Sequence, residues 1–140
     1  MRVIVIVIIV AFIGIQFVPV SRTNPPVTGE IKAPENVMDV LRNSCYDCHS
    51  NENSWPWYSR IAPVSWLVVS DVNEGREYLN FSDWQSYSAK DKAEDLKETW
   101  EDVEEGEMPL WYYLPLHPEA KLSGADKETL KNWVQSGGPH

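Results

Sequence analysis

The chain has 140 residues and a formal net charge of −9 at pH 7, from 21 acidic and 12 basic side chains. This length allows one small domain beside a terminal segment. The acidic balance argues against a nucleic acid as a partner, because the phosphates would be repelled. It favours a basic or neutral protein partner over an acidic one.

The chain begins with an apolar segment from Met1 to Val20, in which Gln16 is the only strongly polar residue after Arg2. Its length of about 18 apolar residues is close to the minimum for a helix that spans a bilayer. We therefore predict a transmembrane helix at residues 1–20 that anchors the chain in a membrane. A secretory signal is the alternative, although no pair of small residues marks a cleavage site after it. Arg2 on the inner side would place the rest of the chain on the exported side.

A linker is predicted from residue 21 to residue 33. Pro25, Pro26 and Gly29 disfavour a helix there and favour an extended tether. The domain itself is predicted at residues 34–136, and a disordered tail at 137–140 completes the chain.

Apolar residues at helical spacing predict the main helices of this domain. Proline suits the first turn of a helix, and serine suits the residue before it. These rules place helices after Pro34, Pro63, Ser88 and Ser123. In the second helix, Trp66, Val69 and Val72 lie three residues apart and are expected to face the core. The last helix is expected to pack on the first.

The only two cysteines lie in the segment Cys45-Tyr46-Asp47-Cys48-His49. This spacing is the attachment pattern of c-type haem. Each thiol forms a thioether with one vinyl group of the same porphyrin, and the adjacent histidine becomes the axial ligand of the iron. We therefore predict one covalent haem c, attached through Cys45 and Cys48, with His49 as an iron ligand.

Two other interpretations of these cysteines exist. A thioredoxin-like redox pair requires a βαβ context, which the helical pattern does not offer. A zinc site requires a second pair of ligands at similar spacing. No third cysteine exists, and the three histidines, His49, His117 and His140, are far apart in sequence. A zinc module held by Cys45, Cys48 and His49 is the alternative to haem.

The proline-rich, aromatic segment from Gly106 to Pro118 is predicted to be a loop that supplies the sixth iron ligand. Met108 lies in this loop beside Pro109, which stiffens it. A methionine thioether is a common sixth ligand in cytochromes c, although core packing is the usual role of a methionine. His117 is the alternative ligand and would give bis-histidine coordination. The terminal His140 is expected to be disordered.

The segment from Asn51 to Arg60 is polar and aromatic, with asparagines and a proline that favour a loop. We expect this loop at the edge of the haem. Arg60 is a candidate partner of a haem propionate, because a guanidinium group pairs well with carboxylates. A solvated surface arginine is the alternative.

Several motifs follow one another in a characteristic order: Cys45 to His49, Ser54 to Trp66, Glu74-Gly75-Arg76, Leu79 to Ser82, Met108-Pro109, Tyr113, His117-Pro118 and Leu122-Ser123. Over about residues 33 to 136 the chain resembles the small bacterial haem-binding domain family of c-type cytochrome character. The resemblance implies covalent haem through Cys45 and Cys48, His49 as axial ligand, and an export signal or anchor ahead of the domain. It therefore implies a location at the bacterial inner membrane, with the haem domain in the periplasm. The family is defined by haem binding rather than by a reaction.

We expect an all-α fold, a cytochrome c-like bundle of about four helices around one covalent haem, preceded by a transmembrane helix. Two filled axial positions leave no place for a substrate at the iron. The expected function is therefore one-electron transfer with a redox protein partner, and not catalysis. With an open or displaceable sixth position, the domain would instead be a haem-based gas sensor or a haem enzyme.

Overall fold

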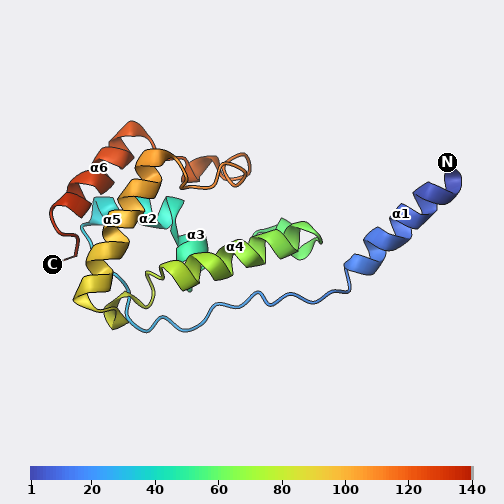
Figure 1. Ribbon diagram of the computed structural model, residues 1–140, viewed down its shortest axis with the longest axis horizontal. Coiled ribbons are helices and arrows are strands. Elements are labelled where there is room, and N and C mark those ends of the chain that lie inside the picture. Colours follow the sequence, from blue (N-terminus) through green and yellow to red (C-terminus); the bar gives the residue numbers. More distant parts are fainter. Residues whose placement is uncertain (140) are drawn as a thin grey trace.

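The computed structural model describes residues 1–139, which form helices, turns and loops without a strand. Figure 1 shows a helical domain, an extended segment that runs along one side of it, and a separate N-terminal helix. The expected all-α fold is confirmed. The α-helices are α1 Arg2–Ile15, α2 Glu35–Ser44, α3 Tyr46–His49, α4 Val64–Tyr78, α5 Ala89–Glu105 and α6 Gly124–Gln135; three 3₁₀ turns are η1 Trp57–Arg60, η2 Trp84–Ser86 and η3 Pro118–Ala120.

The predicted helix ends are confirmed by the hydrogen bonds that terminate them. The Ser88 hydroxyl accepts a hydrogen bond from the backbone N–H of Asp91 at the start of α5. Ser123 and Asp126 form a reciprocal capping box at the start of α6. Gly106 ends α5 in the left-handed conformation, with φ of 83°. Local sequence therefore determines where these helices begin and end.

The hydrophobic core lies between α2, α5 and α6, and α6 packs on both other helices. Leu41 of α2, Val103 of α5 and Leu130 of α6 are almost completely buried. The predicted contact between the last and the first helix of the domain is confirmed. Helix α4 packs instead against α3 and η1, so it joins the bundle through the short helix that carries Cys48 and His49.

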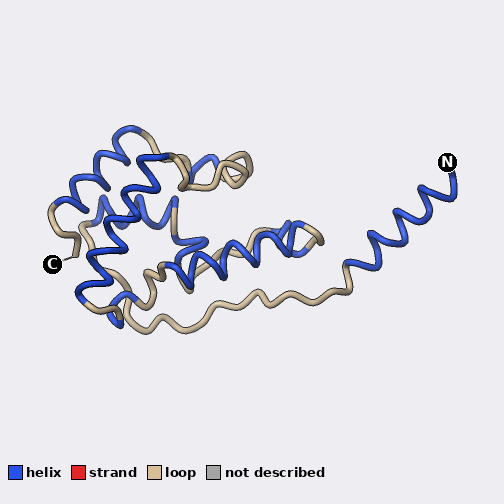
Figure 2. Tube along the Cα trace, in the orientation of Figure 1, coloured by secondary structure: helices blue, strands red, loops and turns tan. Residues whose placement is uncertain are grey.

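The first half of α4 extends beyond the bundle (Figure 2). Val69 and Val72 are buried as predicted, but Trp66 is 37% exposed and Leu67 is 49% exposed. The expectation that Trp66 faces the core is therefore wrong. The reason is the position of the helix, because the three helices of the core do not reach this end of α4 (Figure 1).

The N-terminal helix α1 ends at Ile15, four residues before Pro19, which cannot continue a helix without losing a backbone hydrogen bond. Within residues 1–139, none of the helices combines the length and the apolar character needed to cross a membrane. The predicted transmembrane helix over residues 1–20 is thus not found. The amide of Gln16 instead makes two hydrogen bonds to the backbone of Ala62, of 3.0 and 2.9 Å.

The linker is extended, as predicted, but it is bound to the domain along its length. The backbone N–H groups of Thr28 and Gly29 donate to the Ser82 carbonyl, and that of Ile31 donates to the Phe81 carbonyl at 2.8 Å. The Ile31 side chain is 2% exposed and belongs to the core. Residues 21–33 are therefore part of the domain rather than a free tether, and the predicted domain start at residue 34 is too late.

The C-terminal residues also pack on the domain. Gly138 is buried against Leu96 of α5, where a Cβ atom would have no room. Its N–H donates to the Trp133 carbonyl at 3.0 Å. The prediction of a disordered tail at 137–140 is therefore wrong for Gly138. His140 lies outside the described residues.

Replacement of Leu41 by alanine tests the position of the core. The side chain is fully buried at the centre of the cluster. Leu41→Ala should lower the free energy of unfolding by about 2–5 kcal/mol, because it removes buried apolar contacts and leaves a cavity. Urea unfolding measures this. Leu116→Ala is the matched control at an exposed leucine and should change stability by less than about 0.5 kcal/mol; equal losses in both variants would contradict this core.

Candidate haem site

The motif from Cys45 to His49 forms a single helical turn after a break in the helix. Helix α2 ends at Ser44, and α3 begins directly after Cys45. The N–H groups of Cys48 and His49 both donate to the Cys45 carbonyl, at 3.1 and 2.9 Å. Residues three and four apart on a helix share a face. The turn therefore presents both thiols and the imidazole on the same side.

This side of the turn opens into a cavity of about 300 Å³ between α3, α4, α5 and the loop that follows α5. Cys45, Cys48, His49 and Met108 all line it. A smaller adjoining cavity of about 50 Å³ shares Cys45, His49 and Met108. The volume of the larger cavity lies at the lower end of the range for ligand and cofactor sites. The structure thus brings together both predicted attachment residues and both predicted iron ligands.

The imidazole of His49 is oriented by the backbone of the segment after α4. Its Nδ1 lies 3.1 Å from the Leu79 carbonyl oxygen. Because a carbonyl only accepts, Nδ1 carries the proton and Nε2 holds a free lone pair. Burial lowers the pKa of His49, so the ring is neutral at pH 7. A neutral imidazole with its other nitrogen bonded to a carbonyl is the usual form of an iron-binding histidine.

The two cysteines are free thiols rather than a disulfide. Burial raises the pKa of Cys45 to about 12, and burial together with the charge of Asp47 does the same for Cys48. Both groups are therefore protonated at neutral pH in the metal-free protein. Among residues 1–139, no three His, Cys, Asp or Glu side chains are grouped so that they would hold a metal ion. The zinc alternative gains no support.

Met108 reaches the cavity because of the way in which α5 ends. Gly106 reverses the chain direction, and the N–H groups of Glu107 and Met108 then both donate to the Asp102 carbonyl, at 2.9 and 3.2 Å. These bonds hold the chain against the last turn of α5. The Met108 side chain is partly buried and packs against the core.

A hydrogen bond also joins the loop that carries Met108 to the cysteine motif. The Tyr113 hydroxyl donates to the Asp47 carboxylate at 2.6 Å. The other oxygen of this carboxylate accepts from the Ser54 N–H at 3.1 Å. Asp47, the second residue between the cysteines, thus connects the motif to both loops that flank it.

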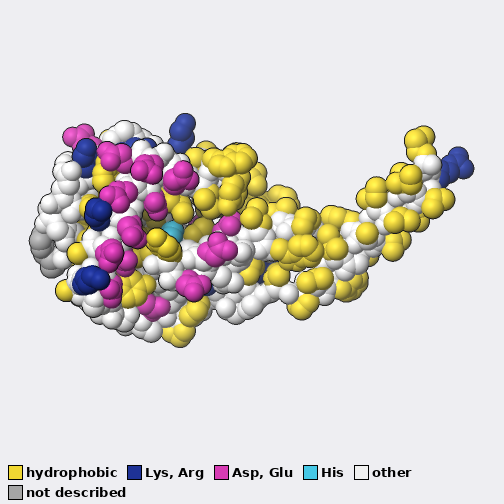
Figure 3. Space-filling model, viewed as in Figure 1, with side chains coloured by type: hydrophobic (Ala, Val, Ile, Leu, Met, Phe, Trp, Pro, Cys, Tyr) yellow, Lys and Arg dark blue, Asp and Glu magenta, His cyan; other side chains and the backbone are white. Residues whose placement is uncertain are grey.

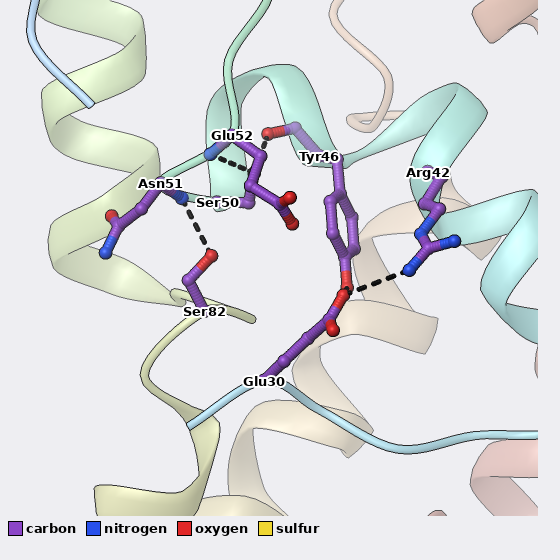
Figure 4. A network of polar contacts seen from close by, with 7 residues as sticks. All are labelled: Glu30, Arg42, Tyr46, Ser50, Asn51, Glu52 and Ser82. Atoms are coloured by element: carbon purple, nitrogen blue, oxygen red, sulfur yellow. Dashed lines mark hydrogen bonds and ion pairs between the residues drawn. The ribbon is translucent and has the colours of Figure 1, made fainter. Parts of the chain in front are cut away.

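The first residue between the cysteines, Tyr46, anchors the motif to the linker (Figure 4). Its hydroxyl donates to Glu30 at 3.0 Å, and Arg42 forms an ion pair with the same carboxylate. The ring is buried and stacks on Phe81, with 5.5 Å between the ring centroids. The Ser50 hydroxyl closes the turn by donating to the Tyr46 carbonyl at 2.7 Å.

Helix α4 approaches the motif closely at Gly75. A Cβ atom at this position would lie 2.8 Å from the Cys48 carbonyl oxygen and 3.2 Å from the Cys48 Cβ. Glycine is therefore required inside this helix, although it lowers helix stability. The close approach fixes the Cys48 side of the cavity.

Two predicted site residues lie elsewhere. His117 stacks on Tyr113, with 4.0 Å between the ring centroids, and its nitrogens contact the Tyr58 hydroxyl at 2.6 Å and the Glu119 carboxylate at 3.1 Å. It does not line the cavity of His49. Arg60 is exposed on η1 and does not line that cavity either. The structure therefore does not bring Arg60 to the place where a haem propionate was expected.

The sequence matches the family model described as the haem-binding domain, over residues 10–136. The chain belongs to the haem-binding domain family. The match confirms the resemblance found in the sequence, and it begins before the linker, in agreement with the packing of residues 21–33. No curated protein and no solved structure matches the chain.

The walls of this candidate haem cavity carry acidic side chains and, among the described residues, no lysine or arginine. Figure 3 shows acidic side chains around a hollow in which a histidine is visible. Burial and neighbouring carboxylates raise the pKa of Asp102 and Asp95. The acidic residues of the lining are Asp47, Asp71, Glu74, Asp95, Glu98 and Asp102.

Sequence reasoning missed the groups that orient the site. The Leu79 carbonyl is a backbone atom and leaves no sequence signal. The bond between Asp47 and Tyr113 joins residues that are 66 positions apart, and only the position of Asp47 inside the motif hinted at a role. Gly75 was noticeable as a glycine within a helical pattern, which indicates a close approach.

A methyl group at Gly75 should disturb the haem-binding domain. Gly75→Ala should lower the free energy of unfolding by about 1–3 kcal/mol, because the new Cβ overlaps the Cys48 backbone. Urea unfolding measures the loss, and the fraction of chains with covalent haem should fall with it. Gly124→Ala is the matched control, since a Cβ there meets nothing within 4 Å. A stabilised Gly75→Ala variant would contradict the close approach.

Proposed function

We propose that this haem-binding domain is a c-type cytochrome that transfers single electrons, with its haem attached through Cys45 and Cys48. The observation that carries the proposal is the common cavity of Cys45, Cys48, His49 and Met108. Two thiols, an imidazole and a thioether are the set of groups that haem c with two axial ligands requires.

Each of the four residues of the cavity would have its own role in holding a haem. A bound haem supplies a one-electron couple at its iron. The thiols of Cys45 and Cys48 would hold the porphyrin by thioether bonds, and the free Nε2 of His49 would bind the iron. The sulfur of Met108 would be the second iron ligand, and a thioether ligand raises the reduction potential.

Met108 is favoured over His117 as the sixth ligand by what each side chain already contacts. The Met108 side chain lines both cavities beside His49. Both ring nitrogens of His117 have hydrogen-bond partners, and the ring is held in a stack with Tyr113. Bis-histidine coordination would require these contacts to break.

The acidic charge around the cavity supports an electron carrier with a basic or neutral protein partner. The rim of the cavity is acidic, and opposite charge on a partner speeds encounter and orients it. Covalent haem attachment takes place on the exported side of the membrane, so the proposal places the domain there, in the periplasm of a bacterium. Occupation of both axial positions argues for an electron carrier rather than an enzyme.

The optical spectrum of the oxidised protein tests the ligand set. Wild type should be low-spin and show the weak far-red charge-transfer band of methionine-bound ferric haem. Met108→Ala should lose this band and should bind carbon monoxide when reduced, because its sixth position is open. His117→Ala is the matched control and should keep the band.

The opposite results would decide against the proposal. A low-spin spectrum that is indifferent to Met108→Ala but changes in His117→Ala would identify His117 as the ligand. A high-spin wild type that binds carbon monoxide tightly would indicate a gas sensor or a haem enzyme.

Removal of the Tyr113 hydroxyl should loosen the loop that holds Met108. Tyr113→Phe keeps the ring that stacks on His117 but deletes the hydrogen bond to Asp47. A lost hydrogen bond to a carboxylate costs about 1.5–3 kcal/mol. Carbon monoxide should therefore bind the reduced variant roughly ten times faster, if loop opening precedes binding. Stopped-flow mixing measures the rate.

Tyr112→Phe is the matched control for this loop. The Tyr112 hydroxyl makes a longer bond of 3.3 Å to Asp71 and lies at the surface. Its removal should leave the rate unchanged within about twofold. Equal effects of the two substitutions would show that Tyr113 does not position Met108.

A further inference from the structure

Two segments of the domain expose apolar side chains and carry almost no charge. Residues 55–67 contain one charged residue, Arg60, and residues 110–116 contain none, in a chain with 21 acidic side chains. Trp57 is 70% exposed and Trp111 is 79% exposed. We call this surface the aromatic tip; its exposed members are Trp57, Ile61, Val64, Trp66, Leu67, Trp111, Tyr112 and Leu116.

The two segments form one continuous surface. Val64 and Leu67 of α4 line a common cavity of about 170 Å³ with Leu110, Tyr112 and Leu116 of the loop. The hydrogen bond of 2.6 Å between Tyr58 and His117 also joins the segments. An exposed apolar surface of this kind marks an interaction site.

The aromatic tip is continuous with the apolar N-terminal helix. Every apolar residue from Val3 to Val10 in α1 is exposed, and none of the helix is buried against the domain. The two hydrogen bonds between the Gln16 amide and the Ala62 backbone hold the end of α1 beside the tip. Helix α1 and the tip therefore lie next to each other in the molecule.

Charge separates this end of the molecule from the haem site. Acidic side chains gather over α5 and around the hollow of the haem cavity, whereas apolar side chains cover the protruding loop, the end of α4 and α1 (Figure 3). Tryptophan and tyrosine prefer the interface between lipid and water, where their rings are buried and their polar atoms stay wet. A charged protein partner has few groups to pair with on the tip, because Arg60 is the single charged residue of its two segments and, among the described residues, the only carboxylates in the cavity between them are those of Asp47 and Asp71.

We propose that the aromatic tip seats on the surface of a lipid bilayer, together with α1. Trp57 and Trp111 enter the interface from two different elements, η1 and the loop after α5. The acidic rim of the haem cavity then remains in water, where a soluble protein can reach it. Of the tip residues only Tyr112 also lines the haem cavity, and the proposal does not depend on the identity of the sixth ligand.

Hydrogen–deuterium exchange of the haem-loaded full chain, with and without phosphatidylcholine vesicles, tests the proposal. Vesicles should slow exchange in residues 2–15, 57–67 and 110–116, and should leave α5 and α6 unchanged. This pattern separates docking of the tip from binding through α1 alone. Because the contact is apolar, it should persist at high salt.

A double substitution at the tip provides a second test. Trp57→Glu with Trp111→Glu should abolish the protection of 57–67 and 110–116, and should weaken vesicle binding roughly tenfold or more. Both side chains are exposed, so the fold should persist. Val27→Glu is the matched control, at an exposed apolar residue outside the tip, and should bind vesicles like wild type.

Three outcomes would overturn the proposal. Protection confined to residues 2–15 would show that α1 alone meets the lipid. Protection of the tip that rises with protein concentration in the absence of vesicles would identify a second copy of the chain as its occupant. Protection that appears only on anionic vesicles and disappears at high salt would show that the contact is electrostatic.

Discussion

The single helical turn from Cys45 to His49 is the constraint on which the rest of the domain depends. Its two thiols and its imidazole have to face the same side, and the Cys45 carbonyl secures this by accepting the N–H groups of Cys48 and His49. A turn of four residues has little stability by itself. The domain therefore surrounds it, with α2 before it, α4 beside it and the linker bonded to Tyr46.

The side chains of the motif show how this support is distributed. The two residues between the cysteines, Tyr46 and Asp47, both make buried or charged contacts. Tyr46 connects the turn to the linker, and Asp47 connects it to the loop of Met108. The linker also supports the motif, because Ile31 belongs to the same buried core cluster as Tyr46. The family match over residues 10–136 covers this linker as well as the helices of the domain.

Charge and apolar surface are separated along the molecule. The acidic rim surrounds the candidate haem cavity, the aromatic tip borders this cavity through Tyr112, and α1 lies at the far end of the molecule (Figure 3). This separation suits a protein whose acidic surface faces water and whose apolar surface, with α1, meets an apolar environment. Among the described residues, no lysine or arginine lines the cavity, and Arg60 lies outside it.

The sequence by itself determined the helices, their caps and the chemistry of the motif, because these depend on residues a few positions apart. The Ser123–Asp126 capping box, the stop at Gly106 and the face shared by Cys45, Cys48 and His49 are all of this kind. Only the tertiary structure decided which distant residues meet the motif. It brought Met108 and the Leu79 carbonyl to the cavity, left His117 and Arg60 outside it, and exposed Trp66 at the end of α4. A periodic pattern predicts that a helix has an apolar face, but it does not predict where neighbouring helices stop covering that face.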